Sequence, residues 1–217
     1  RPFRYHRAMS YANEILRELY YLRAFGYKFA DFSPSSAALP RSLAELNASI
    51  KECNLCELCK SANHALTGLG DKRAKVVFVF DAPNAAEDAS GEFLAGDDKF
   101  LQNLNELAGL KKDEIYVTSL LKCKPAAKAP TNAYELCEPY FSAEARLIAP
   151  KLIVALGEEV FYKMIKQSAQ SFETIRGNIM KFKHSALLAT YSPAVVAKNP
   201  SKKELFFSDL KKIKEYL

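Results

Sequence analysis

Four cysteines are the residues of this chain with the clearest capacity for chemistry. Cys53 and Cys56 lie two residues apart, and Cys123 and Cys137 follow much later, which gives the spacing C-x2-C-x66-C-x13-C. A C-x-x-C turn lets two thiolates face one centre. Cys123 is predicted just past a strand and Cys137 inside the next helix, so both can converge on that centre. Four thiolates suit zinc or an iron–sulfur cluster.

A fifth cysteine, Cys59, makes the total odd and offers Cys56-x-x-Cys59 as an alternative pair. Three cysteines within seven residues fit a metal site in a reducing compartment better than a disulfide framework. No apolar run is long enough to span a membrane, and the basic N-terminus is not followed by the apolar segment of a secretory signal. We therefore expect a cytoplasmic protein without a membrane partner.

The elements that must position the cysteines alternate between strands and helices. Apolar runs predict strands at 75–80, 115–121, 152–156 and 186–190. Helical spacing predicts helices at 41–52, 100–110, 132–148, 158–167 and 201–217. Strand–helix alternation with fully apolar strands predicts an α/β fold, in which a parallel sheet lies between two layers of helices. Ligands of such sheets bind beyond the carboxyl ends of the strands, so we expect the chemistry just after Phe80, Leu121, Leu156 and Thr190.

The N-terminal 40 residues differ from the rest of the chain. Apolar residues at helical spacing predict a helix at 8–25, and a segment rich in proline and serine at 31–40 is the best linker candidate. We therefore expect an appended helical arm at 1–40, which could bind a protein partner, and one domain at 41–217.

Positive charge gathers at the two ends of the chain. The net charge is +4 for residues 1–30 and +6 for residues 176–217, whereas the whole chain carries +6, so the middle is acidic. Basic ends suggest a polyanion partner, with nucleic acid first, although lysines that simply solvate a surface would give the same balance.

The segments from about residue 50 to 212 resemble the family-4 uracil-DNA glycosylases, the iron–sulfur branch of that superfamily. The matching segments are Cys53-x-x-Cys56-x-Leu58, Thr67-Gly68-Leu69-Gly70, Ala82-Pro83, Glu87-Asp88-x-x-Gly91, Tyr116-Val117-Thr118-Ser119-Leu120-Leu121-Lys122-Cys123-Lys124-Pro125, Leu156-Gly157, Thr190-Tyr191-Ser192-Pro193 and Lys198-Asn199-Pro200. The resemblance implies a four-stranded parallel sheet between helices. It also implies a structural [4Fe–4S] cluster on Cys53, Cys56, Cys123 and Cys137, with zinc as the alternative metal.

The chain departs from the family pattern at the positions that handle the base. Asp81 stands where the family has a catalytic glutamate, and it keeps a carboxylate that could act on water. Ser192 replaces the histidine that stabilises the departing uracil anion, and Ser119 replaces the asparagine that reads the uracil edge. A serine hydroxyl cannot pair with a base edge as an amide does. The resemblance places the base pocket at Ala82, Pro83, Phe93, Leu94 and Ser119, where Leu94 aligns with the stacking aromatic residue and Phe93 is one position away.

The resemblance also implies DNA, single- or double-stranded, as the partner. Lys122 and Lys124 flank a cysteine of the cluster, Lys198 and Asn199 follow the family's DNA-penetrating loop, and we expect these four residues to contact phosphate. The altered pocket favours a DNA-binding protein of base-excision-repair type with weak or no activity on uracil. The alternative is an active glycosylase that hydrolyses the N-glycosidic bond of uracil or another deaminated base.

Overall fold

The computed structural model describes residue 21 and residues 40–95, 98–130, 132–166 and 171–217. The strands are β1 (Leu69–Gly70), β2 (Val76–Phe80), β3 (Ile115–Ser119), β4 (Leu152–Leu156), β5 (Ile179–Phe182) and β6 (Ser185–Thr190). The helices are α2 (Leu43–Lys51), α3 (Leu58–Ser61), α4 (Ala85–Ser90), α5 (Asp98–Ala108), α6 (Ala133–Ile148), α7 (Glu158–Ile165), α8 (Phe172–Ile175), α9 (Pro193–Lys198) and α10 (Lys203–Tyr216), with short 3₁₀ turns η1 (Lys112–Glu114) and η2 (Pro200–Lys202).

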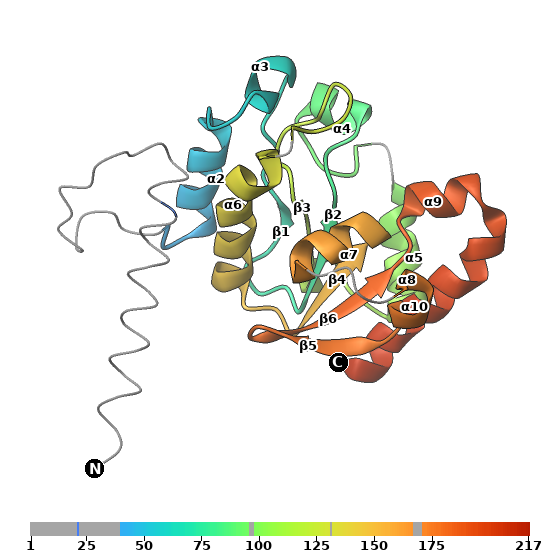
Figure 1. Cartoon of the computed structure of the whole chain (residues 1–217). Coiled ribbons are helices and arrows are strands. Elements are labelled where there is room, and N and C mark those ends of the chain that lie inside the picture. Colours follow the sequence, from blue (N-terminus) through green and yellow to red (C-terminus); the bar gives the residue numbers. More distant parts are fainter. Residues whose placement is uncertain (1–20, 22–39, 96–97, 131, 167–170) are drawn as a thin grey trace, which may run out of the picture.

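The sheet has the strand order β1-β3-β2-β4-β6-β5. Its four inner strands pair in parallel, as the alternation of strands and helices predicts, and this confirms the α/β class. The sheet is wider than the predicted four strands, because β1 and β5 add antiparallel edges. Figure 1 shows helices on both sides of the sheet.

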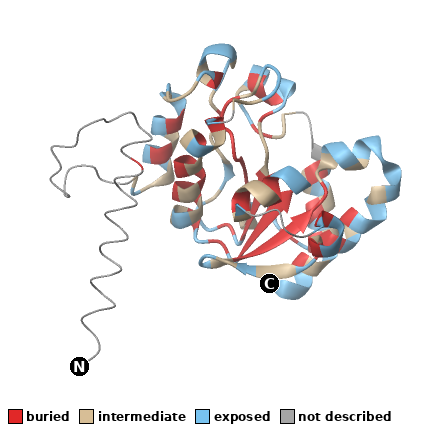
Figure 2. Ribbon diagram, viewed as in Figure 1, coloured by how far each residue is buried: buried red, intermediate tan, exposed pale blue. Residues whose placement is uncertain are grey.

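The inner strands form the core because they bury side chains on both faces. Every residue of β3 and β4 is buried, as are the first four residues of β2. Figure 2 shows this buried layer along the central strands, with exposed residues on the outer sides of the helices. Continuous apolar strands of this kind need cover on both sides, and the helices supply it.

The connections place a topological switch point in the centre of the sheet. The chain leaves β2 for β3 on one side, and it then crosses back over β2 to reach β4 on the other side. Right-handed crossovers put helices after such opposite connections on opposite faces. The crevice that forms where the direction reverses, here between the carboxyl ends of β2 and β4, is where ligands of these sheets bind.

The last helix starts later than the predicted residue 201. Ser201 lies in η2, its hydroxyl donates to Asn199 Oδ1 at 2.7 Å, and α10 starts at Lys203. Apart from Tyr21 and Pro40, the predicted arm at 1–40, with its helix at 8–25, lies outside the described residues. No helix within the described ranges has the length and apolar character needed to cross a bilayer.

Candidate functional site at the carboxyl edge of the sheet

The carboxyl ends of the inner strands lie side by side and are fastened by backbone hydrogen bonds. The N–H of Leu121 donates to the carbonyl of Asp81 at 2.9 Å, which ties the segment after β3 to the segment after β2. The N–H of Gly157 donates to the carbonyl of Thr190 at 2.8 Å, which does the same for β4 and β6. The residues predicted to do chemistry at these ends are therefore on one edge.

Asp81, directly after β2, holds its carboxylate beside the switch point. The hydroxyl of Tyr134 lies 3.0 Å from Oδ1 and 2.9 Å from Oδ2, and Lys163 Nζ lies 3.1 Å from Oδ1. The Lys163 ammonium also lies 3.8 Å from the centre of the Tyr134 ring. Tyr134 comes from the start of α6 and Lys163 from α7, which follows β4, so three elements meet at this carboxylate.

The two partners of Asp81 are electrostatically suited to hold it. Burial raises the pKa of the Tyr134 phenol, and the nearby Asp81 charge adds to the rise, so the hydroxyl keeps its proton and donates it. Burial alone would lower the pKa of Lys163, but hydrogen bonds to Tyr134 and Asp81 outweigh it and the pKa lies above its ordinary value. Lys163 is therefore an ammonium ion, and its positive charge attracts the negatively charged Asp81 carboxylate.

Ser192 lies at the carboxyl end of β6 and is half-buried. It is the N-cap of α9, where its hydroxyl accepts from the N–H of Val195 at 3.3 Å. Gly157 lies beside it: a Cβ on this glycine would stand 3.6 Å from Ser192 Cβ, and the backbone there has a φ of 118°. Ser192, which stands where the resemblance leads us to expect a histidine, therefore caps a helix on the edge of the sheet where we expect the chemistry.

Of the residues predicted to form the base pocket, three are buried and two are half-buried. Ser119 is fully buried and donates its hydroxyl to the carbonyl of Leu121 at 2.6 Å. Phe93 is buried in the main core, and Pro83 is buried as well. Leu94 is half-buried with a φ of 58°, and its N–H donates to Glu87 Oε1 at 2.9 Å. The last predicted residue, Ala82, packs against the buried cluster that contains Cys123 and Cys137.

The expectation that Lys122 contacts phosphate is wrong. Its side chain is 1% exposed, and Nζ lies 2.7 Å from Glu144 Oε2, 2.6 Å from Thr118 Oγ1 and 3.1 Å from the carbonyl of Ser119. Glu144 is fully buried too. The Lys122 ammonium donates all its hydrogen bonds within this internal network, and it is too deeply buried to contact DNA.

The other predicted phosphate contacts remain accessible. Lys198 and Asn199 are exposed at the end of α9, and Lys124 is half-buried. Their contact with phosphate stays a prediction.

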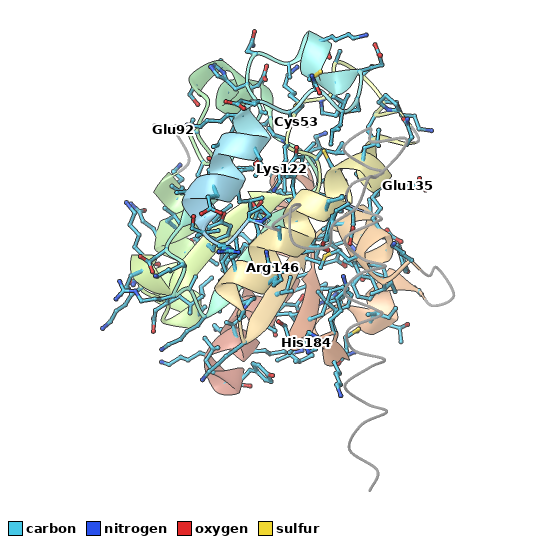
Figure 3. All side chains as sticks on the ribbon, turned by 90° about the vertical axis from the view of Figure 1, so that its left-hand side faces the viewer. Cys53, Glu92, Lys122, Glu135, Arg146 and His184 are labelled. Carbon is cyan, nitrogen blue, oxygen red and sulfur yellow. The ribbon has the colours of Figure 1, made fainter. Side chains whose placement is uncertain are left out.

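The five cysteines gather at this end of the molecule, in the loops near α3 and at the start of α6. Figure 3 shows Cys53 and Lys122 in its upper half, whereas His184 lies near the lower end. Cys123 and Cys137 are buried in one apolar cluster, against which Cys56 and Cys59 pack. Cys53 lies against the neighbouring cluster around Ile50 and Tyr140.

The thiols influence one another, although they do not form a closed ligand set. Burial, followed by the charges of the other cysteines, raises the pKa of Cys123 to about 12. Burial likewise raises the pKa of Cys137 to about 11, against the opposing effect of a hydrogen bond from the Lys122 backbone. Of the side chains that the structure describes, no three Cys, His, Asp or Glu stand close enough together to hold one metal ion. Donor type and common location fit a thiolate-bound centre, because a metal is the partner that compensates crowded thiolates.

Sequence reasoning missed Tyr134 and Lys163. Both lie on predicted helices, but neither belongs to a motif. Only position in the sequence could have indicated Lys163. It lies on the helix that follows the third predicted strand, and a switch point would place that helix beside the carboxyl end of the first predicted strand, where Asp81 lies.

Comparison with known proteins assigns the chain to a family. A model of the uracil DNA glycosylase superfamily matches residues 67–216. The type-4 uracil-DNA glycosylase of Sulfurisphaera tokodaii is 31% identical over 186 residues, which cover 80% of this chain and 84% of that protein. The type-4 enzyme of Archaeoglobus fulgidus is 30% identical over 184 residues, 80% of this chain and 92% of that protein. A type-5 uracil-DNA glycosylase of Mycobacterium tuberculosis is 28% identical over 153 residues, which cover 54% of this chain and 57% of that protein. The chain therefore belongs to the uracil DNA glycosylase superfamily.

Proposed function

We propose that the protein is a DNA glycosylase that hydrolyses the N-glycosidic bond of a deaminated base, uracil or another. The observation that carries this proposal is the Asp81 carboxylate, half-exposed at the switch point and held there by Tyr134 and Lys163. A carboxylate at the ligand-binding edge of the sheet is the group this reaction requires, because it can orient a water molecule or stabilise a cationic sugar.

The reaction consists of one bond broken and one formed. Water oxygen forms a bond to C1′ of the deoxyribose, the C1′–N bond breaks, and the base leaves with the electron pair as an anion. The proton of the water passes to Asp81, and the base anion later takes up a proton from solvent. Extruding the nucleotide from the helix costs a few kcal/mol, which contacts in the pocket must offset.

Activity on uracil itself is expected to be weak. Ser192 offers a neutral hydroxyl where an imidazole would stabilise the base anion, and losing one such donor costs about 10²–10³ in rate. The hydroxyl of Ser119 is already bonded to the carbonyl of Leu121. The base edge would then have to be read largely by backbone groups.

Binding of DNA would use polar and basic residues that follow β3 and β6. Lys198 and Asn199 lie at the end of α9, on the same edge as Ser192, and Lys124 lies beyond β3. Neutralising phosphates releases counterions, so the affinity for DNA should fall as the salt concentration rises.

A [4Fe–4S] cluster is proposed on Cys53, Cys56, Cys123 and Cys137, with zinc as the alternative. The support is the gathering of soft thiolate donors, two of them buried, around one region. When bound, the cluster would join the loop after α2, the loop after β3 and α6, and so would stabilise the segments that carry Asp81 and Tyr134.

The test is release of free base from oligonucleotides that contain uracil, hypoxanthine or xanthine, in single- and double-stranded form. Release that is lost in Asp81→Asn supports the proposal. Salt-sensitive binding of DNA without release of any base, with a type-4 relative active in the same assay, would establish a non-catalytic DNA-binding protein instead.

A further inference from the structure

We infer that Lys163 and Tyr134 are positioning residues, which fix the orientation of the Asp81 carboxylate across the switch point of the sheet. The inference rests on the proposed glycosylase reaction and adds two residues that lie outside the segments matched to the family in the sequence analysis. The carboxylate directly follows strand β2, and the helices after β3 and β4 carry the two donors.

The hydrogen bonds leave acceptor capacity on the Asp81 carboxylate. Tyr134 has a single hydroxyl proton, which lies between Oδ1 and Oδ2, and Lys163 donates to Oδ1. Within the described part of the chain no further donor reaches either oxygen. A carboxylate has about four acceptor sites, so two donors leave room for a water molecule. The side chain of Asp81 is 37% exposed, which leaves room for that water.

The contact of Lys163 with the Tyr134 ring makes the arrangement a closed triangle. The ammonium lies over the ring face at 3.8 Å from its centre, where the negative face of the ring attracts a cation. The phenol hydroxyl of the same ring donates to Asp81. Moving any one of the three groups therefore breaks two contacts, and the aspartate side chain, with its two rotatable bonds, is restricted to one orientation.

The pair of Asp81 and Lys163 is better explained by orientation than by stability. The side chains are 37% and 30% exposed, and ion pairs of this exposure contribute about 0–1 kcal/mol. Lys163 also pairs with Glu159 at 3.3 Å, but Glu159 is 80% exposed and has no hydrogen bond to Asp81. Glu159 thus provides a matched control for the loss of a partner of Lys163.

The kinetic test compares Lys163→Met, Lys163→Arg, Tyr134→Phe and Glu159→Gln in single-turnover base release from the substrate that the wild type cleaves best. Lys163→Met is expected to lower the maximal rate about 10- to 100-fold, since small misplacements of reacting groups have effects of that size. The dissociation constant for DNA should change less than threefold. Arginine should restore most of the rate, Tyr134→Phe should lower it, and Glu159→Gln should leave it unchanged. Equal rates in Lys163→Met and wild type, or no recovery with arginine, would overturn the inference.

A second measurement needs no activity. The protein is labelled with ¹³C at lysine Cε, the Lys163 signal is assigned from its loss in Lys163→Arg, and its titration is compared in wild type and Asp81→Asn. A higher pKa of Lys163 in the wild type supports the contact in solution, and equal pKa values refute it. If no base is released by any variant, the proposed function fails, and this titration still decides whether Lys163 holds Asp81.

Discussion

The buried lysine after β3 gives the sharpest test of the architecture. Replacing Lys122 by methionine keeps an unbranched side chain, one atom shorter, but removes the charge that faces Glu144 at 2.7 Å. Both side chains are at most 1% exposed, so the glutamate would be left buried with only the hydroxyls of Thr118 and Tyr116 as partners. Breaking a buried pair from one side costs about 3–5 kcal/mol.

That loss is large against the total stability of a domain, about 5–15 kcal/mol. With a urea dependence of about 2 kcal/mol per molar, the midpoint of unfolding should fall by roughly 2 M. The assay is equilibrium unfolding in urea at one fixed metal content, followed by circular dichroism. Lys124→Met is the control, because Lys124 is half-buried and forms no ion pair with any residue that the structure describes, and its midpoint should move little.

The double variant Lys122→Met with Glu144→Met shows whether the loss of stability comes from the unpaired Glu144 charge or from lost packing of the Lys122 side chain. Replacing both members of a buried pair by apolar residues is often neutral, so the double variant should regain most of the lost midpoint. A Lys122→Met protein with an unchanged midpoint and a shallower salt dependence of DNA binding would refute the buried pair and return Lys122 to the phosphate-binding surface.

Three further predictions follow from other parts of the structure. Serine at Cys53, Cys56, Cys123 or Cys137 should abolish iron binding in anaerobically purified protein, whereas Cys59→Ser should retain it; equal iron content in all five variants would exclude the proposed ligand set. Ser192→His should raise the rate of uracil release about 10²-fold, because it restores a hydrogen-bond donor to the base anion. The same substitution removes the N-cap of α9 and should lower stability by about 1 kcal/mol. An unchanged rate would show that this position does not face the base. Hydrogen bonds from Lys202 and Tyr191 hold the pKa of Glu173 below its ordinary 4.5, so its contribution to stability is present above that pH and is lost as the pH falls. Thermal unfolding at pH 7 and pH 3.5 should therefore differ less in Glu173→Gln than in the wild type.

The inner sheet could be predicted from the sequence because its strands are buried on both faces. Runs such as Val76–Phe80 and Leu152–Leu156 are apolar at every position, and this pattern is typical of a buried strand. The edge strands carry no such signal. Leu69–Gly70 has two exposed residues, and Ile179–Phe182 has no buried residue, so only pairing with a neighbour defines them as strands.

The location of a residue can be predicted where it follows a strand directly, but not where tertiary contact decides. Asp81 could be placed because the end of a buried strand fixes its location. Lys122 is expected to contact phosphate because it flanks a cysteine of the predicted cluster. Lysine is rarely buried without a partner, and the partner that allows its burial, Glu144, lies 22 residues away. Only the packing of α6 against the sheet brings the two together.

The two lysine–carboxylate pairs near the carboxyl edge differ in what their loss would change. Lys122 and Glu144 are enclosed, so breaking their pair removes a large share of the stability of the fold. Lys163 and Asp81 are about one-third exposed, so breaking theirs costs little stability and chiefly releases the carboxylate. Substitutions in the second pair can therefore accumulate without unfolding the protein. This difference gives a physical reason why changes around the carboxylate would leave the fold of the uracil DNA glycosylase superfamily intact.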